Sequence, residues 1–326
     1  MKAVLINAFG GADVLRIGEV ETPSPGPGQV LIEVIATSVN YADIVQREGN
    51  YPPPKGDSEI LGLEVAGRVS ALGPGVSGWS VGDRVMTLVG GGGYAEYAVA
   101  YADHLIPIPQ SMKFEEAGCV CETYITAYLN TFMLGALKDG ETVLLHGGGG
   151  GVNTAAVHLC KALVPDAKVI VTASPGKVER VAELGADLVV DYKNRDFVEE
   201  VKVYTDNKGV ALILDHIGAA YLASNMKSLA IGGRLVIIGV MGGIKAELNL
   251  VQMMVKRQQV IGSVLRSRSV SEKAAIVSSF TEVVVPLFER REIRPLIHKT
   301  YNLNEIVNAH EAMESGTHFG KIALRL

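Results

Sequence analysis

Five consecutive glycines, residues 147–151, separate the apolar run TVLLH from an amphipathic segment that continues to residue 163. Further apolar runs, KVIVTA, LVVDY, ALILDHIG and GGRLVIIGV, follow in order and alternate with helical segments. Strands that lack polar alternation are buried on both faces, so this pattern predicts an α/β domain with a doubly wound parallel sheet. The glycines then lie between the first strand and the first helix, where a dinucleotide-binding turn belongs.

The glycine run has a physical use at this position. Glycine permits positive φ and lets the main chain approach a pyrophosphate, whose charge is stabilised by the N–H groups and dipole of a helix N-terminus. The fingerprint G-x-G-x-x-G fits with Asn153 in place of its third glycine, so the helix either stands off the strand or is capped by Asn153. We predict a cofactor-binding turn rather than a structural turn or linker, with contacts at Gly148, Gly150, Gly151, Val152 and Asn153.

The end of the second strand, in VIVTASPGKVE, distinguishes NADPH from NADH. NAD-binding sites usually place an acid there, about 20 residues after the turn, to accept from the ribose 2′-hydroxyl. Ser174 occupies that place and Lys177 follows, and these side chains favour a 2′-phosphate that a carboxylate repels. We therefore predict NADPH as the cofactor, the alternative for Lys177 being a solvated lysine at a helix start. Tyr192, after the third strand, is predicted either to lie along the adenosine phosphate or to be an ordinary strand-end tyrosine.

Residues 1–120 follow a different pattern, in which short strands such as VLIEVIATSV and DRVMTLV are separated by glycine and proline turns. This pattern predicts a mainly antiparallel, barrel-like unit. The C-terminal tail reads as a long helix, a strand, a helix and a last strand, and its pattern allows packing on either unit.

Composition narrows the expected partners. A net charge of −5 leaves no basic surplus to bind nucleic acid or an anionic membrane surface. No run of about 18 apolar residues and no signal-peptide pattern is found, so we expect a cytoplasmic protein without membrane insertion. Cys119, Cys121 and Cys160 are expected to be free thiols, and a metal site at Cys119-x-Cys121 is the weaker alternative because structural zinc needs four ligands.

The sequence also resembles a known family. The segments TPSPGPGQVLIEVIATSVNYADIVQREGNYPPP, LGLEVAGRVSALGPGV, VDYKNRDF, GGRLVIIGVMGG, VLRSR and FGKIALRL are together similar to the zinc-independent, zeta-crystallin-like quinone oxidoreductase branch of the medium-chain dehydrogenase/reductase superfamily, and most of all to its p53-inducible subgroup. The resemblance implies a GroES-like catalytic domain, residues 1–122 and 265–326, around an NADPH-binding Rossmann-type domain, residues 123–264. It also implies a homodimer joined through the Rossmann sheets.

The resemblance further implies roles for single residues. Asn40 and Tyr51 would line the substrate side of the nicotinamide, with Asp43 nearby. The residues implied to hold the nicotinamide are Thr126, Gly239 and Met241. Several relatives carry a tyrosine five residues after the asparagine, where this chain has Val45, so Tyr51 or water remains as the proton donor.

Zinc ligands are missing at the positions where zinc-dependent relatives have them. The cysteine and histidine positions hold Asn40 and Leu63 here, so we predict no metal. Quinones and conjugated carbonyls accept hydride without a Lewis acid, because the charge delocalises onto an oxygen. The predicted function is NADPH-dependent reduction of quinones. The alternatives are a 2-alkenal or enoyl reductase and a catalytically weak NADPH-binding protein with a structural or sensing role.

Two other motifs have more than one interpretation. Asp215 and His216 are adjacent in a strand and point to opposite faces, so they cannot form half of a hydrolase triad and are expected to border the cofactor. Arg266 and Arg268, in VLRSR, either serve a phosphate or lie on a solvated surface.

Overall fold

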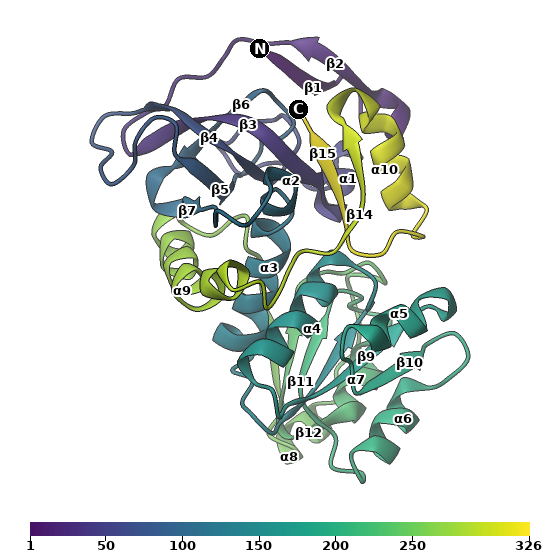
Figure 1. Cartoon of the computed structure of the whole chain (residues 1–326). Coiled ribbons are helices and arrows are strands. Elements are labelled where there is room, and N and C mark those ends of the chain that lie inside the picture. Colours follow the sequence, from purple (N-terminus) through teal and green to yellow (C-terminus); the bar gives the residue numbers. More distant parts are fainter. The chain divides into compact units, whose positions relative to one another are not determined.

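The computed structural model describes residues 1–326, and the chain forms two compact units (Figure 1). Unit 1 contains Met1–Ile125 and Leu265–Leu326, and unit 2 contains Thr126–Val264. Helix α3 (Cys121–Tyr128) includes the last residues of the first segment and the first residues of the second. Both ends of the chain therefore build unit 1, whereas unit 2 is a single continuous segment.

Unit 2 contains a six-stranded sheet in which every neighbouring pair of strands is parallel. Its strands are β8 (Thr142–His146), β9 (Lys168–Ala173), β10 (Leu188–Asp191), β11 (Val210–Asp215), β12 (Leu229–Ile237) and β13 (Gln259–Gly262). The order across the sheet is β10-β9-β8-β11-β12-β13, so the chain reverses direction across the sheet between β8 and β11. This is the Rossmann order, and the predicted doubly wound parallel sheet is confirmed.

The core of unit 2 explains why these segments form buried strands. Leu144, Ile170, Ile213 and Leu235, from four neighbouring strands, are fully buried in one apolar cluster that also includes Phe197. The helical segments are η3 (Leu129–Leu134), α4 (Gly151–Leu163), η4 (Pro175–Lys177), α5 (Val178–Glu183), α6 (Phe197–Tyr204), α7 (Leu222–Ser228) and α8 (Leu250–Val255). In a sheet of this order, ligands bind outside the carboxyl ends of the strands at the reversal, here β8 and β11.

Unit 1 is mainly antiparallel, as predicted. Its seven-stranded sheet has the order β14-β15-β3-β4-β5-β7, β6 also pairs with β3, and β1 and β2 form a separate two-stranded sheet. The strands are β1 (Lys2–Ile6), β2 (Leu15–Glu19), β3 (Gln29–Val39), β4 (Glu64–Leu72), β5 (Arg84–Leu88), β6 (Tyr97–Tyr101), β7 (Ile106–Pro107), β14 (Ile297–Asn302) and β15 (Lys321–Arg325). Figure 1 shows the last strand, in yellow, beside the early strand β3, in purple.

The C-terminal tail packs within unit 1. Its elements are α9 (Val270–Glu289), β14, η5 (Leu303–Glu305), α10 (Ile306–Glu314) and β15, and the other helical segments of the unit are η1 (Ala12–Val14), α1 (Tyr41–Arg47), η2 (Ala102–His104) and α2 (Phe114–Ala117). Helix α9 begins at a capping box in which Ser269 and Glu272 bond each other's main-chain N–H groups. No helix in the structure combines the length and apolar character needed to cross a bilayer.

Candidate functional site

The glycine loop, residues 147–150, connects β8 to α4 at the reversal point of the unit 2 sheet. The N–H groups of Gly147 and Gly148 both donate to the carbonyl of Thr172 on β9, at 3.0 and 2.8 Å. Gly150 donates to the carbonyl of Gly147 at 3.1 Å and occupies the N-cap of α4 without a capping side chain. The first N–H groups of α4 are therefore open to an anion.

At three of these glycines an added Cβ atom would collide with a neighbouring side chain, and at Gly149 that neighbour is the flexible end of Lys177. A Cβ atom on Gly147, which has φ of +80°, would lie 2.6 Å from the His216 ring. On Gly148 it would lie 2.5 Å from Val171, and on Gly149 it would lie 2.4 Å from Cδ of Lys177. The loop is thus a tightly enclosed main-chain turn rather than a flexible linker.

Asn153 secures this loop and does not cap the helix. Its side chain is 2% exposed, and its Nδ2 donates to the carbonyls of His146 and of Gly147, the latter at 3.1 Å. Asn153 thus ties the first turn of α4 back to the end of β8, where a third glycine would only permit close packing. This resolves the two interpretations left open by the sequence, neither of which included a bond to the strand end.

The residues predicted to recognise the adenosine phosphate follow the two strands next to β8. Ser174 directly follows β9, Lys177 ends η4, and Tyr192 directly follows β10 with an exposed ring. The aliphatic stem of Lys177 lies over Gly149, so its amine is held at the glycine loop. Burial, and then the charge of Arg180, lower the pKa of Lys177. The carboxyl ends of three adjacent parallel strands therefore present the loop, a lysine and a tyrosine at one edge.

The remaining predicted nicotinamide residues are less tightly defined. Gly239 packs on His216, and the N–H of Met241 donates to the carbonyl of His216 at 3.1 Å, so the segment after β12 is tied to the end of β11. Thr126 lies in α3, and its carbonyl accepts from Nδ2 of Asn130 at 2.7 Å. The His216 ring lies against Gly147, and Asp215 is fully buried.

In unit 1, Asn40 belongs to a buried ionic cluster. Its Oδ1 accepts from Nζ of Lys321 at 2.5 Å, and its Nδ2 donates to Glu64 at 3.1 Å. Lys321 and Glu64 form an ion pair at 3.0 Å with side chains 4% and 0% exposed, and Ser38 donates to the same carboxylate. The amide of Asn40 is therefore fixed in one orientation by charged partners.

Asp43 is a buried carboxylate that holds the main chain around Asn40 by hydrogen bonds. Its carboxylate accepts from the N–H groups of Asn40 at 2.8 Å and Gly62 at 3.0 Å, and from the hydroxyl of Tyr94 at 3.0 Å. Burial raises the pKa of Asp43 to about 6, although these hydrogen bonds oppose the shift. The contacts describe a side chain that positions Asn40 at the start of α1.

Tyr51 lies under a buried arginine. The guanidinium of Arg266 is 5.0 Å from the centre of the Tyr51 ring and donates to Gln46 at 2.7 Å and to the carbonyl of Gly90 at 2.6 Å. Arg266 is 7% exposed, so it does not lie on a solvated surface, one of the two interpretations of the sequence, and its guanidinium packs over the Tyr51 ring. Burial, and then the charge of Glu122, raise the pKa of Tyr51.

Sequence reasoning missed Lys321, Glu64 and Glu122. Lys321 and Glu64 lie in FGKIALRL and LGLEVAG, segments that carried the family resemblance without a role for their charges. Glu122 donates its main-chain N–H to Glu64 at 2.9 Å, and burial, followed by the charge of Glu64, raises its pKa to about 8. Lys321 and Glu64 thus contact Asn40 alongside Asp43, the one ionisable neighbour that the sequence identified.

The raised pKa of Glu122 predicts a pH-dependent stability. Because its folded-state pKa of about 8 exceeds the ordinary value of 4.5, the folded protein retains a proton that the unfolded chain releases in this range. The contribution of Glu122 to the free energy of unfolding is therefore fully present below about pH 4.5 and is lost as the pH rises through about 8. We measure the free energy of unfolding in urea at pH 5 and at pH 8.5. Between these two pH values, Glu122→Gln should gain about 1–2 kcal/mol in stability relative to the wild type. A gain equal to that of the exposed control Glu282→Gln would contradict this assignment.

The zinc-ligand positions and the cysteines can also be placed. Leu63 is buried, and no group of three or more His, Cys, Asp or Glu side chains is arranged to hold a metal ion. All three cysteines are buried free thiols, and burial raises the pKa of Cys160 to about 12. The chain therefore offers neither a disulfide nor a reactive exposed thiol.

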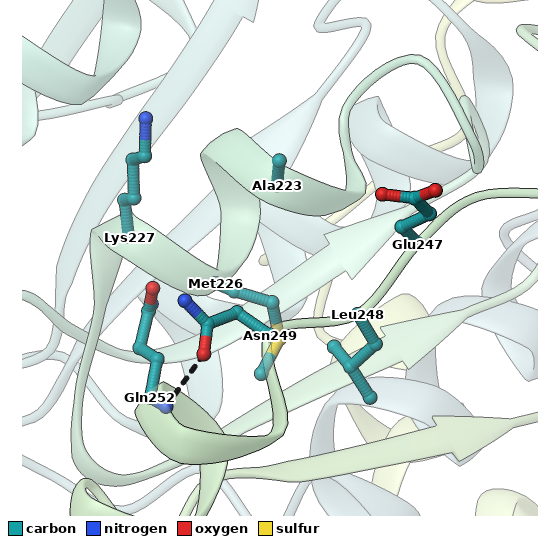
Figure 2. Close-up of a pocket in the computed structure, with 7 residues that line it drawn as sticks. All are labelled: Ala223, Met226, Lys227, Glu247, Leu248, Asn249 and Gln252. Carbon is teal, nitrogen blue, oxygen red and sulfur yellow. Dashed lines mark hydrogen bonds between the residues drawn. The ribbon is translucent and has the colours of Figure 1, made fainter.

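Unit 2 contains a cavity of about 330 Å³. Figure 2 shows its lining, which comes from α7, from the segment leading into α8 and from α8 itself. The lining side chains are Ala223, Met226, Lys227, Glu247, Leu248, Asn249 and Gln252. Asn249 caps α8 by accepting from the N–H of Gln252 at 3.0 Å. None of these residues is among those predicted to bind the cofactor.

Known proteins are similar over the full length of the chain. The alcohol dehydrogenase GroES-like domain matches residues 26–110, and the zinc-binding dehydrogenase family matches residues 184–324. A quinone oxidoreductase of Lama guanicoe is 33% identical, covering 100% of this chain and 98% of the relative. The human synaptic vesicle membrane protein VAT-1 homolog is 31% identical, covering 99% of this chain and 86% of the relative.

Solved structures give the same result. A mycobacterial protein in complex with NADPH has a TM-score of 0.88 at 28% identity, covering 100% of both chains. The JamJ enoyl reductase has a TM-score of 0.89 at 25% identity, covering 99% of this chain and 98% of the other. The resemblance found in the sequence is confirmed: this chain belongs to the medium-chain dehydrogenase/reductase superfamily of oxidoreductases, in its quinone oxidoreductase branch.

Proposed function

We propose that this protein reduces quinones with NADPH, without a metal. The observation that carries the proposal is the enclosed glycine loop at the open N-terminus of α4. Cβ atoms added to this loop would meet His216, Val171 and Lys177. Such a main-chain cradle fits a pyrophosphate. The relative solved with NADPH and the relatives named quinone oxidoreductase support the proposal.

The residues proposed to hold NADPH follow from this cradle. Gly148, Gly150, Gly151, Val152 and Asn153 form the pyrophosphate turn. Lys177, Ser174 and Tyr192 receive the 2′-phosphate, and Thr126, Gly239 and Met241 receive the nicotinamide. When bound, NADPH supplies a hydride equivalent, and the protein supplies binding, orientation and the exclusion of water.

On the substrate side, Asn40 and Tyr51 are proposed to act on the quinone, with Asp43 as a positioning residue. The Tyr51 hydroxyl makes no hydrogen bond within unit 1, so it is free to donate to a substrate oxygen. Reduction of a quinone to a hydroquinone takes one hydride and one proton, and we propose Tyr51 or water as the source of that proton. Asn40, held by Lys321 and Glu64, gives this surface a fixed polar group.

A steady-state assay tests the proposed reaction. Oxidation of NADPH is measured with 1,4-benzoquinone and with trans-2-hexenal, before and after dialysis against a chelator. We expect faster turnover of the quinone and no loss after chelation, because Asn40 and Leu63 stand where zinc ligands would be. Faster turnover of hexenal would favour the enoyl reductase alternative, which the similarity to JamJ supports. NADPH binding without turnover of either would favour the sensing role.

Replacing Ser174 with aspartate is expected to change the cofactor preference. A carboxylate at the end of β9 repels a 2′-phosphate and accepts from the ribose 2′-hydroxyl of NADH. We expect the kcat/KM ratio of NADPH to NADH to fall by about 10–100-fold, because placing like charges together at a binding site is costly. The neutral control Ser174→Asn should change this ratio by less than about threefold. An unchanged ratio in Ser174→Asp would rule out the 2′-phosphate site.

We further propose that the protein is a homodimer joined at the edge of the unit 2 sheet. Strand β13 is the last strand of the sheet, and the neighbouring helix α8 exposes Leu250, Val251, Met254 and Val255, each at least 65% exposed. Exposed apolar side chains beside an open strand edge are typical of an interface.

Light scattering tests the dimer. The wild type should have twice the 34.6 kDa mass of one chain, and Met254→Glu should be monomeric. The control Val203→Glu changes another exposed apolar residue, on α6, and should remain dimeric. A monomeric wild type would overturn the proposal.

A further inference from the structure

Four buried polar side chains form a hydrogen-bond chain that connects the carboxyl ends of β8, β9 and β11 in unit 2. Thr172 on β9, His146 on β8, Asn225 on α7 and Asp215 on β11 are each at most 1% exposed. Asp215 and Asn225 are 3.1 Å apart, Asn225 and His146 are 2.7 Å apart, and His146 and Thr172 are 3.1 Å apart. Thr172 Oγ1 accepts from the N–H of Gly147 at 3.2 Å. One end of this hydrogen-bond chain is therefore bonded to the glycine loop.

The partners fix the direction of every bond in this hydrogen-bond chain. The carboxylate of Asp215 only accepts, so Asn225 turns its Nδ2 toward it and its Oδ1 toward His146. His146 must then carry its proton on Nε2 and accept from the Thr172 hydroxyl at Nδ1, an assignment that follows from the network. The Thr172 oxygen is left to accept from Gly147. Donation thus runs in one direction, from the loop to the buried charge of Asp215.

The arrangement needs a neutral imidazole, and the surroundings provide one. The His146 ring meets the rings of Phe197 and Tyr221 edge-on, each at 4.9 Å between ring centres. Burial lowers the pKa of His146 to about 3, so the Nε2–H form persists at neutral pH. The imidazole therefore stays neutral near pH 7, and its two hydrogen bonds are kept.

Asp215 connects the same chain to the second loop at the reversal point. Its carboxylate accepts from the N–H groups of Ile217 at 2.7 Å and Gly218 at 3.1 Å, which fix the segment that follows β11. That segment begins with His216, whose ring lies against Gly147. One buried network therefore sets both main-chain segments that border the ligand crevice.

We propose that Thr172, His146, Asn225 and Asp215 are positioning residues that hold the glycine loop ready for the NADPH pyrophosphate, an inference that rests on the proposed function. A loop held in its binding conformation loses less freedom when the cofactor binds. None of these four side chains is among the residues proposed to hold the nicotinamide or to act on the quinone. Loss of the hydrogen-bond chain should therefore weaken cofactor affinity more than the rate of the chemical step.

Threonine 172 allows the sharpest test, because valine keeps its shape and serine keeps its hydroxyl. We expect Thr172→Val to weaken NADPH binding about tenfold, measured by isothermal titration, while kcat at saturating NADPH changes little. Thr172→Ser should bind NADPH within about twofold of the wild type. If the four side chains act together, the double variant Thr172→Val with Asn225→Leu should bind NADPH little more weakly than the weaker-binding of the two single variants.

Hydrogen exchange separates this inference from the proposed function. The peptide that contains Gly147 and Gly148 should exchange faster in Thr172→Val than in the wild type or Thr172→Ser, with no cofactor present. Failure of the wild type to bind NADPH would overturn the proposed function, and the exchange result would still decide whether the chain holds the loop. Unchanged exchange, or a Thr172→Val protein that binds NADPH normally, would overturn the inference.

Discussion

Replacing Gly150 with aspartate is expected to abolish NADPH binding while the fold is kept or stabilised. Gly150 is the N-cap of α4, with φ of −82° and ψ of 157°, a conformation that any residue adopts. A Cβ atom there would meet only the carbonyl of Gly147, at 3.5 Å. The new carboxylate would cap the first N–H groups of α4 and repel the pyrophosphate. We expect NADPH affinity to fall by at least about 100-fold, because like charges cost several kcal/mol at such a site.

Two measurements make this result specific. The melting temperature of Gly150→Asp should equal or exceed that of the wild type, because an acidic N-cap stabilises a helix by about 0.3–1 kcal/mol. The matched variant Gly150→Asn caps the helix without charge and should lose less than about tenfold in affinity. If Gly150→Asp binds NADPH within about threefold of the wild type, the N-terminus of α4 is not the pyrophosphate site.

Replacing Lys321 with methionine is expected to destabilise unit 1 by about 3–5 kcal/mol. The substitution leaves the buried carboxylate of Glu64 without its ion pair and removes the donor to Oδ1 of Asn40. The double variant Lys321→Met with Glu64→Gln removes both charges and should recover most of this loss. Urea unfolding followed by circular dichroism measures the three free energies.

An exposed ion pair provides the control for this second prediction. Lys202 and Glu199 on α6 lie 2.6 Å apart with side chains 44% and 63% exposed, so Lys202→Met should cost less than about 1 kcal/mol. A loss in Lys321→Met as small as that in Lys202→Met would contradict a buried ionic cluster. A double variant less stable than Lys321→Met would also contradict it.

The fold was predictable because its signals are local. Unalternating apolar runs such as TVLLH and KVIVTA separated by helical segments indicate a parallel sheet, and the glycines after the first run locate the ligand end of that sheet. Glycine and proline turns marked the antiparallel unit for the same reason. The sequence pattern did not place the C-terminal tail, because the partner of β15 is β3, near the other end of the chain.

The parts of the site that escaped prediction depend on long-range contacts. Lys321 meets Asn40 across 281 positions of the chain, and no spacing rule connects them. Arg266 was placed near a phosphate or in solvent because its partners, Gln46 and Gly90, come from distant segments. Asn153 was recognised as a departure from the fingerprint, but its bond to the end of β8 follows only from the loop's path.

The most direct test of the account is the isotope effect on NADPH oxidation in a single turnover with 1,4-benzoquinone. NADPH deuterated separately at each face of nicotinamide C4 is bound to the enzyme, which is then mixed with the quinone in a stopped-flow instrument. The account predicts slower oxidation with one of the two deuterated cofactors and no semiquinone signal by electron paramagnetic resonance. Equal rates with both cofactors, together with a semiquinone signal, would show one-electron chemistry and contradict hydride reduction.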